Sequence, residues 1–406
     1  MSEWKSLSSI TSKIGSGSTP RGGNSVYSDS GISFIRSQNV LDMDFSTENL
    51  AFINDNQAEK LNNVIVEKND ILLNITGDSI ARCTVVPEEI LPARVNQHVS
   101  IIRCKNTEES KYVMYYLQYM KKYLLQISKV GGTRNALTKE AIGKLPIKIS
   151  DDCNKISKIL DNIDQKIQTN NQINQELEAM AKTLYDYWFV QFDFPDQNGK
   201  PYKSSGGKMV YHPELKREIP EGWGVEKLKY FSKYVSDKVE SSELNIENYV
   251  GTDNMIPDMG GIELTTSIPK LGTSTKFSIG DILISNIRPY FKKIWLSDRL
   301  GGCSSDVLCI RTRKIVSREF VFATLARDDF FNYDVAGSKG SKMPRGDKKH
   351  IMEYPIVFEF EIADQFSKIV RPIYEAVHKN YNQNQELTQL RDWLLPMLMN
   401  GQVKVE

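Results

Sequence analysis

A segment that occurs twice constrains the fold of this chain more than any other feature of its sequence. Residues 171–180 read NQINQELEAM, and residues 381–390 read YNQNQELTQL. The agreement extends to a gap-free alignment of residues 156–177 with residues 366–387, which contains nine identities in 22 positions. Such a match between two distant segments indicates an internal duplication.

Shorter matches occur in the same order before each copy of this segment. NDILLNI at 69–75 matches GDILISN at 280–286, and LPIKI at 145–149 matches YPIVF at 354–358. Because the order is kept, we infer that a globular domain and a helix were duplicated together. The predicted parts are a first globular domain at 1–150, a helical spacer at 151–191, a connector at 192–222, a second globular domain at 223–361 and a second helical spacer at 362–406.

Both repeated segments carry a coiled-coil seam, in which apolar residues and asparagines recur at alternating spacings of three and four. The seam of the first segment consists of Ile156, Leu160, Ile163, Ile167, Asn170, Asn174 and Leu177. The seam of the second segment consists of Phe366, Val370, Ile373, Val377, Asn380, Asn384 and Leu387. Pro372 predicts a bend near the start of the second helix.

The asparagines in the two seams indicate how the helices pair. A seam asparagine costs stability unless a second one meets it, and an antiparallel pair brings the two asparagine layers together. At about 1.5 Å per residue, such a pair is a spacer on the order of 50 Å long. The alternative is that each helix packs only on its own domain.

Each globular region combines short strands with one helix. We expect strands such as DILLNI and VSIIRC in the first region, and helices at 109–128 and 317–333. The proline- and glycine-rich stretch 192–222 is predicted to lack regular structure. The predicted fold class is therefore α/β (α+β) with long α-helices, in which an antiparallel two-helix coiled coil separates two globular domains related by an internal pseudo-two-fold repeat.

Motifs of several enzyme classes are missing from the sequence. It contains no G-x-x-x-x-G-K-[ST] phosphate loop, no G-x-S-x-G nucleophile elbow and no Asn/Asp-Pro-Pro-aromatic tetrapeptide of an adenine-amino methyltransferase. The four histidines form no H-x-x-x-H pair. We therefore predict no catalytic residue, no metal site and no cofactor in this chain.

One acidic pattern matches a metal-dependent nuclease letter for letter. Asp196 is followed by Glu214 and Lys216, but that chemistry needs carboxylates held on adjacent strands. Here the residues lie in the connector, so we interpret the match as coincidental.

Composition narrows the compartment but not the function. The five cysteines are odd in number and never form C-x-x-C, the N-terminus lacks a secretory apolar core, and no run of eighteen apolar residues occurs. These features predict a cytoplasmic protein. Because the net charge is only +1, affinity for nucleic acid has to come from local clusters.

Two glycine-rich basic loops occupy corresponding places in the two halves. Residues 129–148 hold five Lys or Arg against one Glu, and residues 335–350 hold five against one Asp. Glycine allows close approach to a phosphate, lysine and arginine neutralise it, and arginine and amide side chains suit base edges. With the stretches 77–99 and 286–295, the candidate DNA-binding residues are Arg82, Arg94, Asn96, Gln97, His98, Thr133, Arg134, Asn135, Lys139, Arg288, Tyr290, Lys292, Lys293, Ser338, Lys339, Lys342, Arg345, Lys348 and Lys349. The competing interpretation is that these are ordinary solvated loops.

The chain resembles the specificity subunit of Type I restriction–modification enzymes over essentially its whole length. The resemblance rests on the duplicated order of domain and helix and on the motifs DILLNITGDSIAR, VNQHVSIIR and GTRNALTKEAIGKLPI. The block LYDYWFVQFDFP…GKPYKSSGGKMVYHPELKREIPEGW after the first helix is more specific than the other motifs.

The resemblance implies that both globular domains are target-recognition domains for double-stranded DNA and that the chain itself is not an enzyme. Methyl transfer to adenine would belong to modification subunits, expected in two copies, and ATP-dependent translocation and cleavage to restriction subunits. The helix faces that carry Tyr185, Tyr187, Trp188, Trp393 and Leu394 are expected to need partner subunits to cover them. The alternative function is a non-catalytic scaffold that assembles through its coiled coil and has no DNA specificity.

Overall fold

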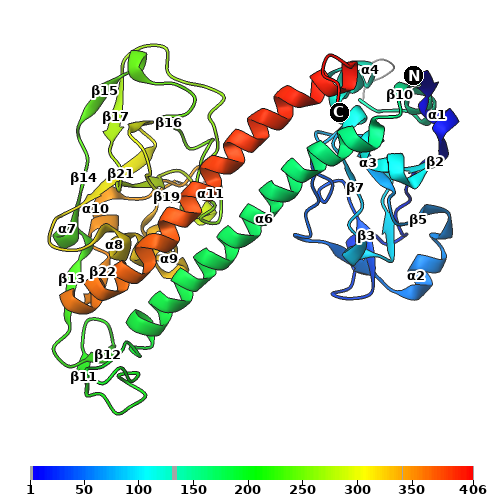
Figure 1. Cartoon of the computed structure of the whole chain (residues 1–406). Coiled ribbons are helices and arrows are strands. Elements are labelled where there is room, and N and C mark those ends of the chain that lie inside the picture. Colours follow the sequence, from blue (N-terminus) through cyan, green and yellow to red (C-terminus); the bar gives the residue numbers. More distant parts are fainter. Residues whose placement is uncertain (1–2, 130–134, 341, 406) are drawn as a thin grey trace. The chain divides into compact units, whose positions relative to one another are not determined.

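The computed structural model describes residues 3–129, 135–340 and 342–405. The chain forms two compact units, the first made of residues 1–170 with 383–406 and the second of residues 171–382. Each unit holds one globular domain of mixed helix and sheet and a part of each of two long helices, α6 (Cys153–Tyr185) and α11 (Phe360–Asn400) (Figure 1). The predicted mixed fold with long helices is confirmed.

The first globular domain is built on two four-stranded sheets. The antiparallel sheet has the order β2 (Thr11–Ser16), β9 (Val99–Cys104), β6 (Ile71–Asn74), β7 (Cys83–Val85). The second sheet is mixed and has the order β4 (Ala51–Ile53), β3 (Ile32–Ile35), β8 (Ala93–Val95), β5 (Ile65–Val66). A separate antiparallel pair joins β1 (Glu3–Ser6) to β10 (Pro146–Ile149). The helices are α1 (Leu7–Ile10), α2 (Asp55–Glu59), α3 (Ser110–Tyr119), α4 (Lys121–Ile127) and α5 (Lys139–Gly143).

The second globular domain repeats this plan. Its antiparallel sheet has the order β14 (Ser232–Tyr234), β21 (Val307–Thr312), β18 (Ile282–Ser285), β19 (Ile294–Leu296). Its mixed sheet has the order β15 (Lys238–Glu240), β17 (Thr273–Phe277), β20 (Gly301–Cys303), β16 (Tyr249–Val250). The separate pair joins β13 (Gly224–Lys227) to β22 (Pro355–Phe358). The helices are α7 (Leu228–Phe231), α8 (Arg318–Leu325), α9 (Asp328–Gly337) and α10 (Lys348–Met352). The antiparallel sheets and the separate strand pairs share one strand order, which confirms the internal repeat. The mixed sheets differ, because the fourth strand of the first domain, β4, pairs with the parallel neighbour of β8, whereas that of the second domain, β15, pairs with the antiparallel neighbour of β20.

The repeated Asp-Ile-Leu motif has the same structural role in both domains. In the first, the buried Asp70 accepts two hydrogen bonds of 2.8 Å from Arg103 on β9 and one of 2.7 Å from the Glu67 amide. In the second, Asp281 accepts bonds of 2.8 and 2.7 Å from Arg311 on β21 and one of 2.7 Å from the Ser278 amide. The aspartate thus accepts a hydrogen bond from a backbone amide of the preceding turn and links its own strand to the neighbouring strand. The link is strong because the two carboxylate oxygens accept two hydrogen bonds from one guanidinium.

Within the first unit, α6 and α11 pack antiparallel. Asp164 accepts a hydrogen bond of 2.8 Å from Arg391, and the Asn170 amide donates to the Asn384 carbonyl oxygen at 2.8 Å. As the residue number rises along α6 it falls along α11, which is the signature of an antiparallel pair. Leu160 is fully buried in the core that this helix pair shares with the first globular domain.

Within the second unit the pairing continues in the same sense. The Asn380 amide donates to the Asn174 carbonyl oxygen at 2.8 Å, and the rings of Tyr185 and Phe366 meet at 5.7 Å. Every predicted seam residue in both units is buried or half-buried. The antiparallel two-helix coiled coil is confirmed, and in each asparagine layer an amide donates to an asparagine of the other helix.

Several boundaries differ from the predictions. The helix predicted at 109–128 breaks at Met120 into α3 and α4, and that at 317–333 breaks at Ala326 and Arg327 into α8 and α9. The predicted bend at Pro372 does not end α11, which remains one helix from residue 360 to residue 400. The lost amide hydrogen bond there is tolerated because the residues around Pro372 pack on the core of the second unit.

The connector is also more structured than predicted. It contains the hairpin of β11 (Met209–His212) and β12 (Arg217–Pro220). Phe192, Phe194 and Ile219 are buried in the core of the second unit, where the ring of Phe194 stacks on Tyr202 at 4.7 Å. Burial of these side chains stabilises a defined structure in the connector, which its proline and glycine content does not predict.

The expectation that the aromatic residues after the first repeat need a partner is wrong for two of them. Tyr185 and Trp188 are 6% and 4% exposed and belong to the core of the second unit. Leu394 packs against the core of the first unit. Tyr187 and Trp393 are 38% and 57% exposed, so they alone of this set lie on the surface.

Candidate nucleic-acid interface

In the first unit, residues 135–137 of the basic loop contact the end of strand β6. Ala136 forms a β-bridge with Thr76, and the Leu137 amide donates to the Ile75 carbonyl at 2.9 Å. This contact brings Asn135 next to the turn that follows β6. Two segments separated by about sixty residues in the sequence therefore form one surface.

That surface encloses a hollow of about 890 Å³. Three of the predicted DNA-binding residues, Arg82, His98 and Asn135, line it. His98 is held in place, because its Nδ1 shares a hydrogen bond of 2.6 Å with the Thr76 hydroxyl and its backbone amide donates to Asn96 Oδ1 at 3.1 Å. A guanidinium, an imidazole and an amide around one hollow provide donors for phosphates and both donors and acceptors for base edges.

The neighbours of this hollow have mixed roles. Gln97 is exposed, its amide lies 3.2 Å from His98 Nε2, and its Oε1 accepts a hydrogen bond from the Thr19 hydroxyl. Lys139 is exposed in the first turn of α5. Thr133 and Arg134 lie outside the described residues.

Arg94 does not belong to the surface, contrary to the prediction. It is 7% exposed, and its guanidinium donates to the Ala58 carbonyl at 3.3 Å and to Asn62 Oδ1 at 3.4 Å. Burial lowers the pKa of Arg94 from its ordinary value. Asn96 is likewise buried, and its Oδ1 holds the turn before β9. Both residues stabilise the fold, because their polar atoms form hydrogen bonds inside the domain.

In the second unit, the basic loop returns to the equivalent strand end. Arg345 forms β-bridges with Ile287, after β18, and with Lys339. The Arg288 amide donates to the Pro344 carbonyl at 2.8 Å. The loop of each domain therefore docks on the segment that follows the central strand carrying the Asp-Ile-Leu motif.

Several basic side chains of the second loop are free to meet a ligand. Lys342, Lys348 and Lys349 are exposed. Lys339 lies 2.7 Å from Asp347, and its hydrogen bond lowers the pKa of Asp347 to about 2. Arg345 lies 3.2 Å from Asp306. These ion pairs are exposed and weak, so a phosphate can replace the carboxylate.

The stretch 286–295 contributes less than predicted. Lys293 donates to the Thr252 carbonyl at 2.7 Å, and burial lowers its pKa, so it serves the fold. Lys292 lies 2.7 Å from Asp328. Tyr290 is 47% exposed and accessible, whereas Arg288 is half-buried with a positive φ of 51°.

Ser338 also has a local role, because its hydroxyl donates to the Val335 carbonyl at 2.7 Å.

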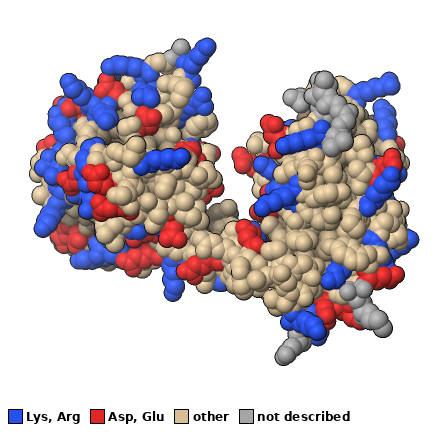
Figure 2. All heavy atoms as spheres, turned by 90° about the horizontal axis from the view of Figure 1, so that it is seen from above, with Lys and Arg blue, Asp and Glu red and all other residues tan. Residues whose placement is uncertain are grey.

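Positive and negative side chains are intermixed on the surface. On the face drawn in Figure 2, Lys and Arg side chains lie among Asp and Glu side chains on each unit. This pattern agrees with the net charge of +1. Any contact with a polyanion therefore depends on particular loops and not on a uniformly basic face.

Several residues that line the first hollow are not among the predicted DNA-binding residues. Its further lining residues are Ser37 and Gln38 from one turn, Thr76, Gly77, Asp78 and Ser79 from a second turn, and Ala136 from the basic loop. The signal for one of these turns was present in the motif T-G-D-S before Arg82, since Gly77 has a positive φ of 80°. Ser37 and Gln38 carried no comparable signal.

The first acidic residue that matches a nuclease pattern has a structural role in the described part of the chain. Asp196 accepts hydrogen bonds of 2.8 Å from the amides of Asn198 and Lys200 and so caps a turn. No group of three or more His, Cys, Asp or Glu suited to a metal occurs among the described residues. Within the same residues, no helix has the length and apolar character needed to cross a membrane.

Comparison with known proteins defines the class of this fold. Residues 1–179 match the family described as Type I restriction modification DNA specificity domain. The chain is 25% identical over 343 residues to the Type I restriction enzyme MjaIX specificity subunit of Methanocaldococcus jannaschii, covering 78% of this chain and 74% of that one. It is 23% identical over 334 residues to the HindI specificity subunit of Haemophilus influenzae, covering 67% and 72%.

A solved structure agrees at the level of the fold. The crystal structure of the Type I restriction–modification S subunit from M. genitalium has a TM-score of 0.59 at 12% identity and covers 100% of this chain and 97% of its own. The family match of residues 1–179 and the similarity to two specificity subunits support the resemblance to Type I restriction–modification specificity subunits that the motifs predicted.

Proposed function

We propose that this chain is the subunit that recognises double-stranded DNA for a Type I restriction–modification complex. The observation that carries the proposal is the equivalent docking of the two basic loops, through Ala136 on Thr76 and through Arg345 on Ile287. The two loops occupy the same position on the duplicated scaffold but differ in sequence. Each loop can therefore recognise a different half-site.

The target is bipartite and asymmetric in this proposal. The domain at 1–150 reads one half-site and the domain at 223–361 reads the other, with the helical spacers at 151–191 and 362–406 setting an unread gap. Half-sites read from one face of B-DNA lie about one helical turn, roughly 34 Å, apart. Exposed lysines such as Lys139, Lys342 and Lys348 set the register on phosphates, and Arg82, Asn135 and Arg345 contact base edges.

Catalysis in this proposal belongs to other subunits. Modification subunits methylate adenine, and restriction subunits use ATP to translocate and cleave DNA. The chain directs both activities by choosing where the complex binds. The exposed side chains of Tyr187 and Trp393 are available for contacts with these subunits.

The test measures duplex binding by the assembled complex as salt concentration is raised, for the native chain and for Arg82→Ala. We expect a steep salt dependence for both, because phosphate contacts release counterions. Arg82→Ala should weaken the half-site of the first domain by about 1–3 kcal/mol per lost base contact and leave the other half-site unchanged. Binding that ignores both salt and sequence would favour a scaffold protein instead.

A further inference from the structure

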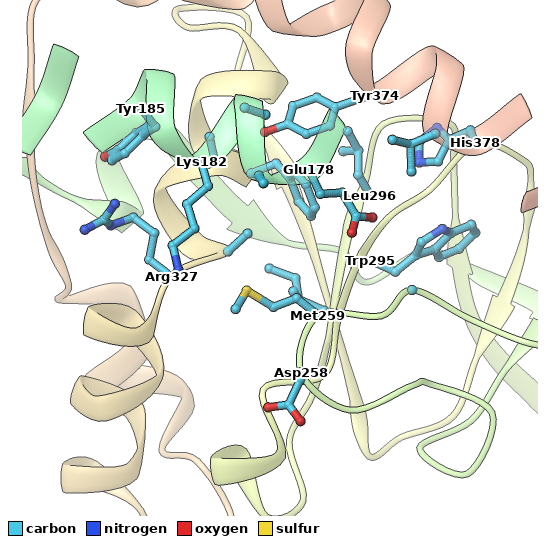
Figure 3. Close-up of a pocket in the computed structure, with 18 of the residues that line it drawn as sticks. Glu178, Lys182, Tyr185, Asp258, Met259, Trp295, Leu296, Arg327, Tyr374 and His378 are labelled. Carbon is cyan, nitrogen blue, oxygen red and sulfur yellow. The ribbon is translucent and has the colours of Figure 1, made fainter. Parts of the chain in front are cut away.

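A cavity of about 220 Å³ lies within the second unit, between the α6–α11 helix pair and the second globular domain (Figure 3). Its walls are mainly apolar and include Met259, Trp295, Leu296 and Tyr374. A 150 Å³ cavity with apolar walls is large enough for benzene, and drug-sized sites begin at about 300 Å³. The space therefore fits one ring with a short side chain.

A carboxylate reaches into this cavity from α6. The side chain of Glu178 points into the space between Met259 and Trp295 (Figure 3). The carboxylate accepts a hydrogen bond of 3.5 Å from the Tyr381 hydroxyl, and no ion pair with a basic side chain of the described residues compensates its charge. Burial raises the pKa of Glu178 to about 7.

The other charged groups around the cavity are occupied or face solvent. Arg327 is paired with Asp186 and, at 3.0 Å, with Asp329. Lys182 and Asp258 are exposed.

On α11, burial lowers the pKa of His378 and so favours its neutral ring, and burial raises the pKa of the Tyr374 and Tyr381 hydroxyls. Glu178 is therefore the charged group in the cavity that still needs a partner.

The first unit offers an internal comparison, because the repeat gives each residue of the helix pair a counterpart. Glu178 corresponds to Thr388, Ala181 to Arg391 and Tyr374 to Asp164. In the first unit, Arg391 donates to Asp164 at 2.8 Å and the Tyr115 hydroxyl donates to the same carboxylate at 2.6 Å.

In the second unit the equivalent positions hold Ala181 and Tyr374, which form no ion pair and line the cavity. The Glu178 carboxylate lies in this cavity without a basic partner among the described residues. An open apolar space next to an uncompensated acid is costly to the fold unless a ligand uses it.

We propose that this cavity binds a small organic cation, namely a protonated primary amine carried on a flat apolar body. The ammonium pairs with the Glu178 carboxylate, and the apolar body lies against Trp295 and Tyr374. Aromatic rings attract a cation through their electron-rich faces, and a charge-assisted hydrogen bond to a carboxylate is stronger than a neutral one. The inference is independent of DNA recognition.

The test titrates 2-phenylethylamine hydrochloride into the full chain by isothermal calorimetry. We expect saturable binding that weakens at least tenfold in Glu178→Gln and in Glu178→Thr, which introduces the residue found at the equivalent position of the other unit. Glu176→Gln is the matched control, because Glu176 is exposed on the same helix and should change affinity less than twofold. The neutral analogue 2-phenylethanol should bind at least tenfold more weakly.

The pH dependence supplies a second readout. Because Glu178 has a pKa of about 7, its carboxylate is mostly ionised at pH 8 and mostly protonated at pH 6. The affinity for the amine should therefore rise about tenfold from pH 6 to pH 8 in the native chain, and this rise should be absent in Glu178→Gln.

Equal affinity for the alcohol and the amine would overturn the proposal. So would unchanged binding by folded Glu178→Gln or Glu178→Thr, with folding verified by circular dichroism, or the absence of binding at millimolar amine.

Discussion

Lengthening the α6–α11 helix pair should widen the unread gap of the DNA target. The perturbation inserts seven residues into α6 between Asn170 and Asn174 and seven into α11 between Asn380 and Asn384. Both insertions are needed because the helices are antiparallel and the two asparagine layers bond across them. Seven residues keep the 3-4 phase of the seam, so the apolar face stays turned toward the partner helix.

The magnitude follows from the helix itself. Seven residues at about 1.5 Å each lengthen the pair by roughly 10 Å. One base pair of B-DNA advances by about 3.4 Å per strand, so the gap should grow by about three base pairs. The half-sites should not change, because the insertion leaves both hydrogen-bonded loops of the globular domains intact.

The assay maps methylated adenines in cells that carry the complex with the native or the lengthened chain. Insertion into α6 alone is the matched control: it moves Asn170 away from Asn384 and should reduce stability without giving a new defined gap. An unchanged gap with both insertions in a folded chain would refute the spacer role.

Three further outcomes are expected. Asp281→Asn should lower the free energy of unfolding, measured in urea, by about 3 kcal/mol, because Arg311 loses its buried partner. Asp237→Asn removes the exposed partner of the same arginine and should lower it by less than about 1 kcal/mol. Arg94→Met should destabilise the first domain in the same measurement while leaving the methylated sequence unchanged, since its guanidinium bonds are internal. Arg134→Ala should weaken only one half-site in a duplex-binding assay; equal loss on random DNA would make Arg134 a phosphate contact.

Much of the architecture could be predicted from the repeat. The seam residues recur with helical period, and a buried asparagine at Asn170 or Asn174 requires a polar partner, so the pairing of the helices follows from local chemistry. The Asp-Ile-Leu match likewise marks equivalent strands, because the same aspartate ends the same turn in β6 and β18.

The candidate site was predicted less well, because burial is a property of the whole domain. Arg82 and Arg94 lie in one basic stretch and look alike in the sequence. Only the fold directs Arg82 to a surface hollow and Arg94 to the Ala58 carbonyl inside the domain. The sequence likewise predicts an exposed face at Tyr185 and Trp188, and the fold buries both side chains.

The sequence by itself determined the duplication, the two long helices and the antiparallel match of their asparagine layers, since these depend on residue order and period alone. The tertiary structure decided which basic side chains reach solvent, that the connector folds on the second unit, and that one half of the repeat holds a cavity beside Glu178. Those outcomes depend on which distant side chains share a space, and no local pattern records how that space is filled.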